Sequence, residues 1–271
     1  MIADWDDAYN NAGHIPDGAA WPDRWAAAAG AFRATLAPDR YRGALAYGPH
    51  PRERADLFLP ETRPAGLFVF VHGGYWMRFD RSVWSHLAAG PLARGWAVAM
   101  PSYPLAPEAR VAVITRSTRA AIEAAAAAIP GPVVLAGHSA GGHLVARQVC
   151  ADTGLAPASL RRIRRVVAIS GLHDLRPLMA TKLNATLRLD PAEAAAESPA
   201  LLAPLPGARV TAWVGAAERP EFIRQTALLA NIWTGLGAEM GEVIAPERHH
   251  FDVIEAQADP GSDLVGAVVG D

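Results

Sequence analysis

Residues 133–149 read VVLAGHSAGGHLVARQV and join a short apolar run to a helical stretch through a glycine-rich turn. The run VVLA predicts a buried strand, and the residues from Ala140 onward predict a helix. Between them, Gly137-His138-Ser139-Ala140-Gly141 fits G-x-S-x-G, the pattern of a sharp strand-to-helix turn that exposes a serine hydroxyl. We therefore predict that Ser139 is a nucleophile and that the N–H of Ala140 faces the developing oxyanion. On the pattern alone, an ordinary glycine-rich turn is the alternative.

Similar apolar runs recur along the chain, and each is closed by Gly, Pro or Ser. Continuous runs of this length are typical of strands buried on both faces, as in a parallel sheet. Two earlier runs fit an antiparallel hairpin at the sheet edge. The runs are Leu67–Val71, Trp96–Met100, Val133–Ala136, Val166–Ser170, Val210–Val214 and Glu242–Ala245, with the edge pair near 44–47 and 55–59.

Helical stretches separate these runs, at 108–129, 140–151, 221–236 and 251–269. The alternation predicts an α/β protein with a mostly parallel eight-stranded sheet and helices on both faces. Ligands of such sheets bind at the carboxyl ends of the strands.

Two segments stand outside the alternation. Residues 1–40 form an N-terminal extension with an Ala-rich helix near 24–36, and residues 174–206 follow a strand end, where an insertion would form a small lid. We see no internal repeat and no linker, so we expect a single domain over 1–271.

Composition and charge exclude several classes of function. Hydrophobic residues make up 51% and charged residues 19%, as in soluble globular proteins, and the net charge of −2 predicts no nucleic-acid partner. The basic run at 161–165 is expected to be a solvated helix end or loop. One cysteine gives no disulfide framework. The acidic start lacks a signal-peptide pattern and no apolar run is long enough to span a membrane, so we expect a cytoplasmic protein without a membrane partner.

Cofactor and metal patterns are also missing from the sequence. It contains no Walker A or G-x-G-x-x-G fingerprint, and its histidines are not spaced as in H-E-x-x-H. We therefore expect no cofactor and no metal. The sequence leaves both a monomer and a homodimer open.

A second glycine pair follows the run Leu67–Val71, in the string His72-Gly73-Gly74-Tyr75-Trp76. An oxyanion hole needs backbone N–H groups that side chains do not cover, and an H-G-G run after an early strand is the loop that supplies them in lipases and esterases. We predict Gly73 and Gly74 as donors. Tyr75 and Trp76 stand where they would stack on an aromatic substrate, with core packing as the alternative.

The general base is expected near the end of the chain, because the order in such sheets is Ser, then the acid, then His. His250 follows the last predicted strand and is the candidate, while its neighbour His249 is expected to cap or to pack. Glu218 is the first carboxylate after the strand Val210–Val214 and is the candidate acid. Asp174 and Glu221 are the alternatives.

Taken together, the motifs resemble those of the kynurenine formamidase (arylformamidase) branch of the α/β-hydrolase superfamily, which also holds bacterial esterases and lipases. The resemblance rests on HGGYW at 72–76, GHSAGGHL at 137–144, SGLHDLRPL at 170–178, VGAAERPEFIRQ at 214–225 and HHFDVIEA at 249–256. It implies the α/β-hydrolase fold and the triad Ser139, Glu218 and His250. The family usually has aspartate where this chain has Glu218, which is one methylene longer, so its loop must retract slightly.

The resemblance implies a small-molecule substrate: an acyl amide or ester cleaved through an acyl-serine, with N-formylkynurenine as the first expectation. A carboxylesterase for short acyl esters would use the same residues. A non-catalytic binding protein on a hydrolase scaffold is the third possibility, although such proteins typically lose the nucleophile or the histidine, and here both are present.

Overall fold

A computed structural model describes residues 2–270, so the two ends of the predicted domain, residues 1 and 271, lie outside the described range. Its centre is an eight-stranded sheet in the order β1-β2-β4-β3-β5-β6-β7-β8. Strand β2 runs antiparallel to β1 and β4, and the other pairs are parallel. The predicted sheet and its edge hairpin are confirmed. The strands are β1 Tyr41–Ala46, β2 Arg54–Phe58, β3 Leu67–Val71, β4 Ala97–Pro101, β5 Val133–His138, β6 Ile163–Ile169, β7 Arg209–Gly215 and β8 Glu239–Ala245.

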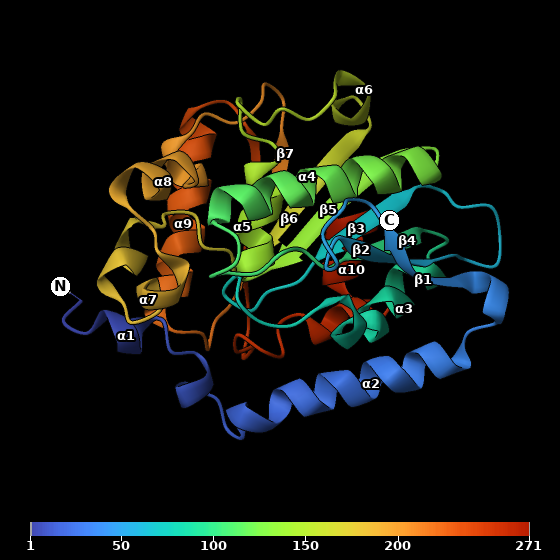
Figure 1. Ribbon diagram of the computed structural model, residues 1–271, viewed down its shortest axis with the longest axis horizontal. Helices are drawn as coiled ribbons and strands as arrows, with labels where there is room; N and C mark the ends of the chain where they lie inside the picture. The colour runs from blue at the N-terminus through green and yellow to red at the C-terminus, as the bar shows by residue number, and fades with distance from the viewer. Residues whose placement is uncertain (1, 271) are drawn as a thin grey trace.

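Helices cover both faces of the sheet (Figure 1). Along β3, Leu67, Val69 and Val71 pack into one core, while Phe68 and Phe70 pack into the other. This alternation is why a strand buried on both faces is a continuous apolar run. The first core is completed by α4 Val111–Ala128, α5 Ala140–Arg147 and α9 Pro220–Gly235, and the second by α2 Trp21–Thr35, α3 Ala89–Ala93 and α10 Asp263–Val269.

The remaining elements are short and connect the layers. None of the helices in the described part of the chain has the length and apolar character needed to cross a membrane. The short elements are the α-helices α1 Trp5–Ala8, α6 Pro157–Leu160, α7 Asn184–Leu187 and α8 Pro191–Ala196 and the 3-10 helices η1 Ala12–His14, η2 Gly18–Ala20, η3 Pro38–Arg40, η4 Arg81–Val83, η5 Ser85–Ala88, η6 Arg176–Ala180, η7 Pro199–Leu201 and η8 Glu255–Ala258.

The predicted helix over 251–269 is wrong. This stretch forms a turn, the 3-10 helix η8 and, separately, α10. Pro260 interrupts it, because the residue before a proline avoids the helical region, and Asp259 is accordingly extended at φ −94° and ψ 115°. Ser262 then caps the new helix by accepting a hydrogen bond from the N–H of Val265.

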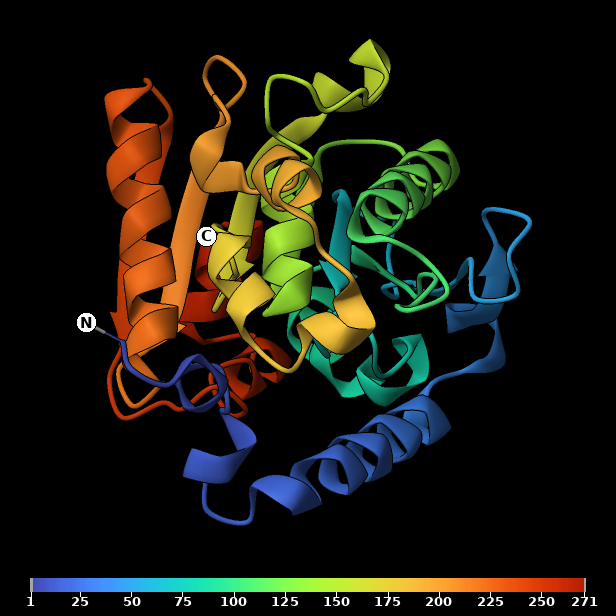
Figure 2. The ribbon, with the colours of Figure 1, turned by 60° about the vertical axis from the view of Figure 1, so that its left-hand side comes forward.

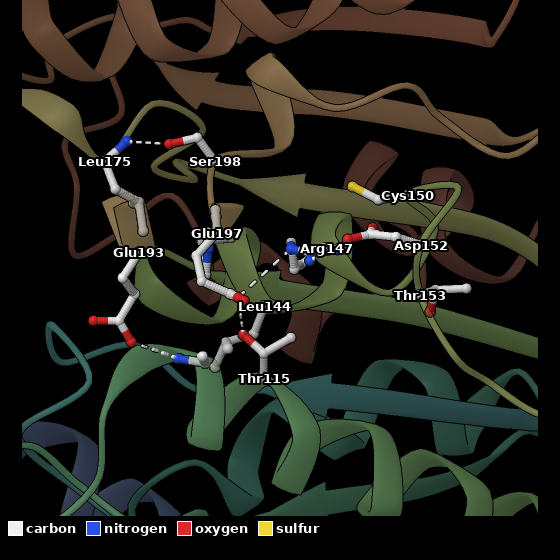
Figure 3. Close-up of polar contacts among 12 residues, drawn as sticks. Thr115, Leu144, Arg147, Cys150, Asp152, Thr153, Leu175, Glu193, Glu197 and Ser198 are labelled. Atoms are coloured by element: carbon white, nitrogen blue, oxygen red, sulfur yellow. Dashed lines mark hydrogen bonds and ion pairs between the residues drawn. The ribbon is translucent and has the colours of Figure 1, made fainter. Parts of the chain in front are cut away.

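The segment 174–206 is tied to the helices beneath it by a buried polar network (Figure 3). The Thr115 hydroxyl donates to the Glu197 carboxylate at 2.6 Å, and Arg147 Nε lies 3.5 Å from the same carboxylate. Arg147 also holds Asp152 through two bonds of 2.7 and 2.9 Å. Burial raises the pKa of Glu197, against the opposing effect of Thr115 and Arg147. The base of this segment is therefore fixed to α4 and α5.

We predict that Arg147→Met lowers the free energy of unfolding by about 3 kcal/mol, because it leaves the Glu197 carboxylate buried without its cation. Urea denaturation measures the change. The matched control is Arg209→Met, since Arg209 also pairs with a glutamate at 2.6 Å but both side chains are more than half exposed. This control should cost less than about 1 kcal/mol. Equal losses in the two variants would contradict the prediction.

Candidate active site

Ser139 sits at the sharp turn between β5 and α5. Its backbone has φ 56° and ψ −118°, a strained conformation for a non-glycine residue, and its N–H donates to the Ile169 carbonyl at 2.8 Å. The turn is pressed against β3: a Cβ on Gly141 would lie 1.9 Å from the Val71 carbonyl oxygen. Only glycine fits there, and this close approach sets the start of α5 beside the end of β3.

The glycine loop that follows β3 lies next to the serine. A Cβ on Gly73 would be 3.0 Å from Cβ of Ser139. Within residues 2–270, the backbone N–H groups of Gly73, Gly74 and Ala140 donate to no protein acceptor. The loop itself is closed by the Gly74 carbonyl, which accepts from the N–H groups of Met77 and Arg78 at 3.0 Å each. These three N–H groups are thus available to an oxyanion formed at Ser139.

Glu218 and His250 form a buried pair. The carboxylate Oε2 lies 2.6 Å from His250 Nδ1, and the side chains are 0% and 4% exposed. The other carboxylate oxygen accepts from the Ser170 hydroxyl at 2.5 Å and from the Gly215 N–H at 2.9 Å. With Nδ1–H directed to the acid, the neutral ring carries its free lone pair on Nε2, as a general base requires.

Ser170 was not singled out in the sequence. It ends the apolar run Val166–Ser170, takes a positive φ of 51° and contacts the Glu218 carboxylate from the residue just after β6. The sequence holds no sign that this hydroxyl reaches a carboxylate 48 positions further on.

The two alternative acids, Asp174 and Glu221, bind other partners than His250. The Asp174 carboxylate pairs with Arg176, which keeps the pKa of Asp174 below its usual range although burial alone would raise it. The Glu221 carboxylate accepts from the Tyr9 hydroxyl at 2.8 Å and pairs with Arg224 at 2.7 Å. His249, the neighbour of the candidate base, is occupied by backbone contacts: its Nδ1 accepts from the N–H groups of Phe251 and Asp252.

His138 positions the backbone of the candidate base. Its Nε2–H donates to the His250 carbonyl at 2.8 Å, and the two rings are 4.6 Å apart. Burial, followed by the nearby His250, lowers the pKa of His138 well below its usual value. A neutral His138 leaves the proton chemistry of this histidine pair to His250.

Ser139 and His250 line one cavity of about 960 Å³. Its wall combines aromatic side chains with polar and charged ones, and it draws on both segments outside the alternating pattern. These contribute residues between 4 and 25 of the N-terminal extension and Lys182, Leu183 and Thr186 of the 174–206 segment. Figure 2 shows the N-terminal segment crossing one end of the sheet. The aromatic and histidine side chains of the lining are Tyr9, Trp25, Tyr75, Phe79, Trp84, His138, His250 and Phe251.

The two wall segments are linked to each other and to the glycine loop. The Tyr75 hydroxyl donates to the Tyr9 carbonyl at 2.6 Å, and the Lys182 backbone N–H donates to the Asp6 carboxylate at 2.6 Å. The Lys182 ammonium, with its side chain 92% exposed, lies 3.7 Å from the same carboxylate. The N-terminal segment is therefore a fixed wall of the cavity.

Tyr75 and Trp76 differ in their placement. Tyr75 lines the cavity, as expected for a residue that contacts substrate. The same expectation for Trp76 is corrected: its side chain is fully buried outside the cavity lining, and its indole N–H donates to His143 Nδ1 at 3.3 Å. Trp76 takes the core-packing alternative, because the left-handed backbone at 75–76 sends the two successive side chains to different surroundings. No group of three or more His, Cys, Asp or Glu residues in the described range is arranged to hold a metal ion.

Residues 68–267 match the family model described as the alpha/beta hydrolase family. Among curated proteins, the kynurenine formamidase of Drosophila melanogaster is 30% identical over 238 residues, covering 81% of this chain and 78% of that protein. The kynurenine formamidase of Danio rerio is 26% identical over 223 residues, covering 79% and 75%. The resemblance drawn from the motifs is confirmed.

Solved structures agree on the fold. A crystal structure from Silicibacter sp. TM1040, described as a candidate thioesterase, superposes with a TM-score of 0.94 at 54% identity and covers 98% of both chains. An esterase of Pyrobaculum calidifontis has a TM-score of 0.70 at 19% identity, covering 88% of this chain and 85% of that one, which supports the fold alone.

We predict that Glu218→Gln lowers kcat about 10⁴-fold, because the amide no longer selects the tautomer or stabilises the protonated ring of His250. Steady-state kinetics on an activated ester measures the effect. Asp174→Asn serves as the control and should keep kcat within about threefold, since its partner is Arg176. A large loss in Asp174→Asn with a small one in Glu218→Gln would transfer the role of acid to Asp174.

Proposed function

Because this chain belongs to the alpha/beta hydrolase family, we propose that it is a serine hydrolase that cleaves N-formyl aryl amides, with N-formylkynurenine as the first substrate to test. The observation that carries the proposal is the buried Glu218–His250 pair, whose histidine lines one cavity together with Ser139 and Gly74. The similarity to curated kynurenine formamidases supports the choice of substrate.

The reaction proceeds in two acyl transfers. His250 Nε2 takes the hydroxyl proton of Ser139, and Oγ attacks the formyl carbon. The N–H groups of Gly73, Gly74 and Ala140 hold the oxyanion, each worth roughly 3–4 kcal/mol if typical. Protonated His250 then gives its proton to the departing aryl amine, leaving formyl-serine. Water, deprotonated by His250, attacks this ester and releases formate, and the proton returns to Ser139.

The lining of the cavity supports an aryl leaving group. Aromatic side chains from three parts of the chain meet around it: Tyr9 and Trp25 from the N-terminal segment, Phe79 and Trp84 after the glycine loop, and Phe251 beside His250. Such walls bind planar rings by burying their apolar area and by edge-to-face contact. The formyl group is the smallest acyl group, so it needs the least room beside the serine, and the ring would contact the aromatic side chains.

A second candidate function is the cleavage of short-chain esters or thioesters. The 54% identity to the Silicibacter candidate thioesterase favours it. The same residues would serve, and ester or thiol leaving groups need less protonation than an aryl amine. The two functions therefore differ in how strongly the leaving group depends on His250 as an acid.

We predict a kcat/KM for N-formylkynurenine at least 100-fold above that for p-nitrophenyl acetate and butyrate, about 2.7 kcal/mol of transition-state discrimination. Ser139→Ala should lower kcat about 10⁶-fold on every substrate that is cleaved while the protein stays folded. Parallel kinetics on the two proteins, with circular dichroism as the check on folding, measures both effects.

The outcomes separate the candidates. Fast ester turnover with negligible formamide cleavage would identify an esterase and overturn the formamidase proposal. Strong hydrolysis that survives in Ser139→Ala would remove the serine mechanism. Failure of the wild type to react with a fluorophosphonate probe would support the non-catalytic binding protein.

A further inference from the structure

Asn11 is a buried side chain whose polar atoms have no partner. It is 5% exposed, and among the described residues neither its Nδ2 nor its Oδ1 has a hydrogen-bond partner. It also lines the cavity of Ser139 and His250. A buried amide without partners costs about 1–3 kcal/mol for each unsatisfied group, so a protein keeps one there when something else completes its bonds.

The surrounding contacts fix the position of Asn11. Its backbone N–H donates to the Tyr9 carbonyl at 3.2 Å, and its carbonyl accepts from the His14 N–H at 3.0 Å. Tyr9 is in turn held from two sides, by the Tyr75 hydroxyl on its carbonyl and by Glu221 on its own hydroxyl. The backbone of Asn11 is therefore held in place before any substrate enters, which limits where its side chain can lie and reduces the entropy lost on binding.

Two other residues of the lining also have buried polar atoms without partners in the described chain: Trp84 at Nε1 and His138 at Nδ1. The indole N–H can only donate. His138 Nδ1 can only accept, because its Nε2 carries the proton that is given to His250. Asn11 alone of the three offers both a donor and an acceptor. Polar groups at defined positions in the wall are typical of sites that orient a ligand.

We propose that Asn11 is a specificity-determining residue that pairs with a substrate group outside the scissile bond that presents both an N–H donor and a C=O acceptor. The α-amino acid of N-formylkynurenine presents both, and a carboxamide on the leaving group is the simplest neutral probe of the same pairing. The inference rests on the proposed acyl transfer at Ser139, and it applies to amide and ester substrates alike. Substrates with this group gain two hydrogen bonds at Asn11, whereas those without it leave both atoms unpaired. We expect no role for Asn11 in the bond-breaking steps.

The test compares matched substrates on wild type and Asn11→Leu, which keeps the approximate size and removes both polar atoms. The ester series is phenyl acetate with its ortho, meta and para carboxamides. The formamide series is N-phenylformamide with the same three substituents. For at least one isomer, we expect wild-type kcat/KM to exceed that of the unsubstituted parent by tenfold or more. Asn11→Leu should bring the ratio of kcat/KM for the carboxamide to kcat/KM for the parent to within threefold of one.

Controls keep the test decisive. Asn231→Leu changes an exposed asparagine on α9 outside the cavity lining and should leave every ratio unchanged. If Asn11→Leu does not fold, Asn11→Ala, which adds no volume, provides the same comparison. A preference that is absent in wild type, or that survives in the variants, would overturn the inference, as would equal losses on parent and carboxamide. If the wild type turns over the esters but cleaves no formamide, the proposed formamidase is refuted. The ester series then still measures the role of Asn11.

Discussion

The site depends on the close approach of two backbones, those of Gly141 at the start of α5 and Val71 at the end of β3. Because no side chain fits between them, the serine turn and the glycine loop are held at one distance. The loop donors and Ser139 then keep their relative position without any contribution from flexible side chains. The strands β3 and β5 are also parallel neighbours, and this pairing fixes the distance between them within the sheet. Both strands are buried on each face. Preorganised donors of this kind stabilise developing charge without reorganising during the reaction.

A second layer of the site comes from segments that lie outside the alternating pattern. The N-terminal segment reaches across one end of the sheet, where hydrogen bonds from Tyr75 and to Glu221 of α9 hold Tyr9 in the cavity wall. The 174–206 segment is fixed below by the network around Glu197 and meets the N-terminal segment at Asp6. The candidate nucleophile, acid and base thus follow strands of the sheet, while part of the cavity wall comes from these two segments. In this arrangement, substrate choice can change without disturbing the serine, acid and base.

The sequence predicted most of what local pattern controls. Apolar runs located the strands, and the glycines around Ser139 and after β3 located the turn and the donor loop, because backbone constraints of this kind leave residue-level marks. The pairing of Glu218 with His250 followed from the order of the strands. The helix predicted over 251–269 was wrong because the prediction read the stretch as one helix and did not take account of the break that Pro260 imposes. The placement of Trp76, the support from Ser170 and the unpaired amide of Asn11 could not be predicted, since each depends on contacts between distant parts of the chain. No pattern within a few residues of Asn11 indicates that its side chain is buried in the cavity of a serine 128 positions later.

Lys182 has a practical consequence for watching this cavity. It is the only lysine in a chain whose other 24 basic residues are arginines, and its ammonium is exposed at the cavity wall beside Asp6. An amine-directed fluorophore would therefore place its side-chain label at a single site, at the seam where the two wall segments meet. The emission of such a label responds to the polarity and crowding around it, so the protein carries a natural attachment point for recording when ligands fill the cavity.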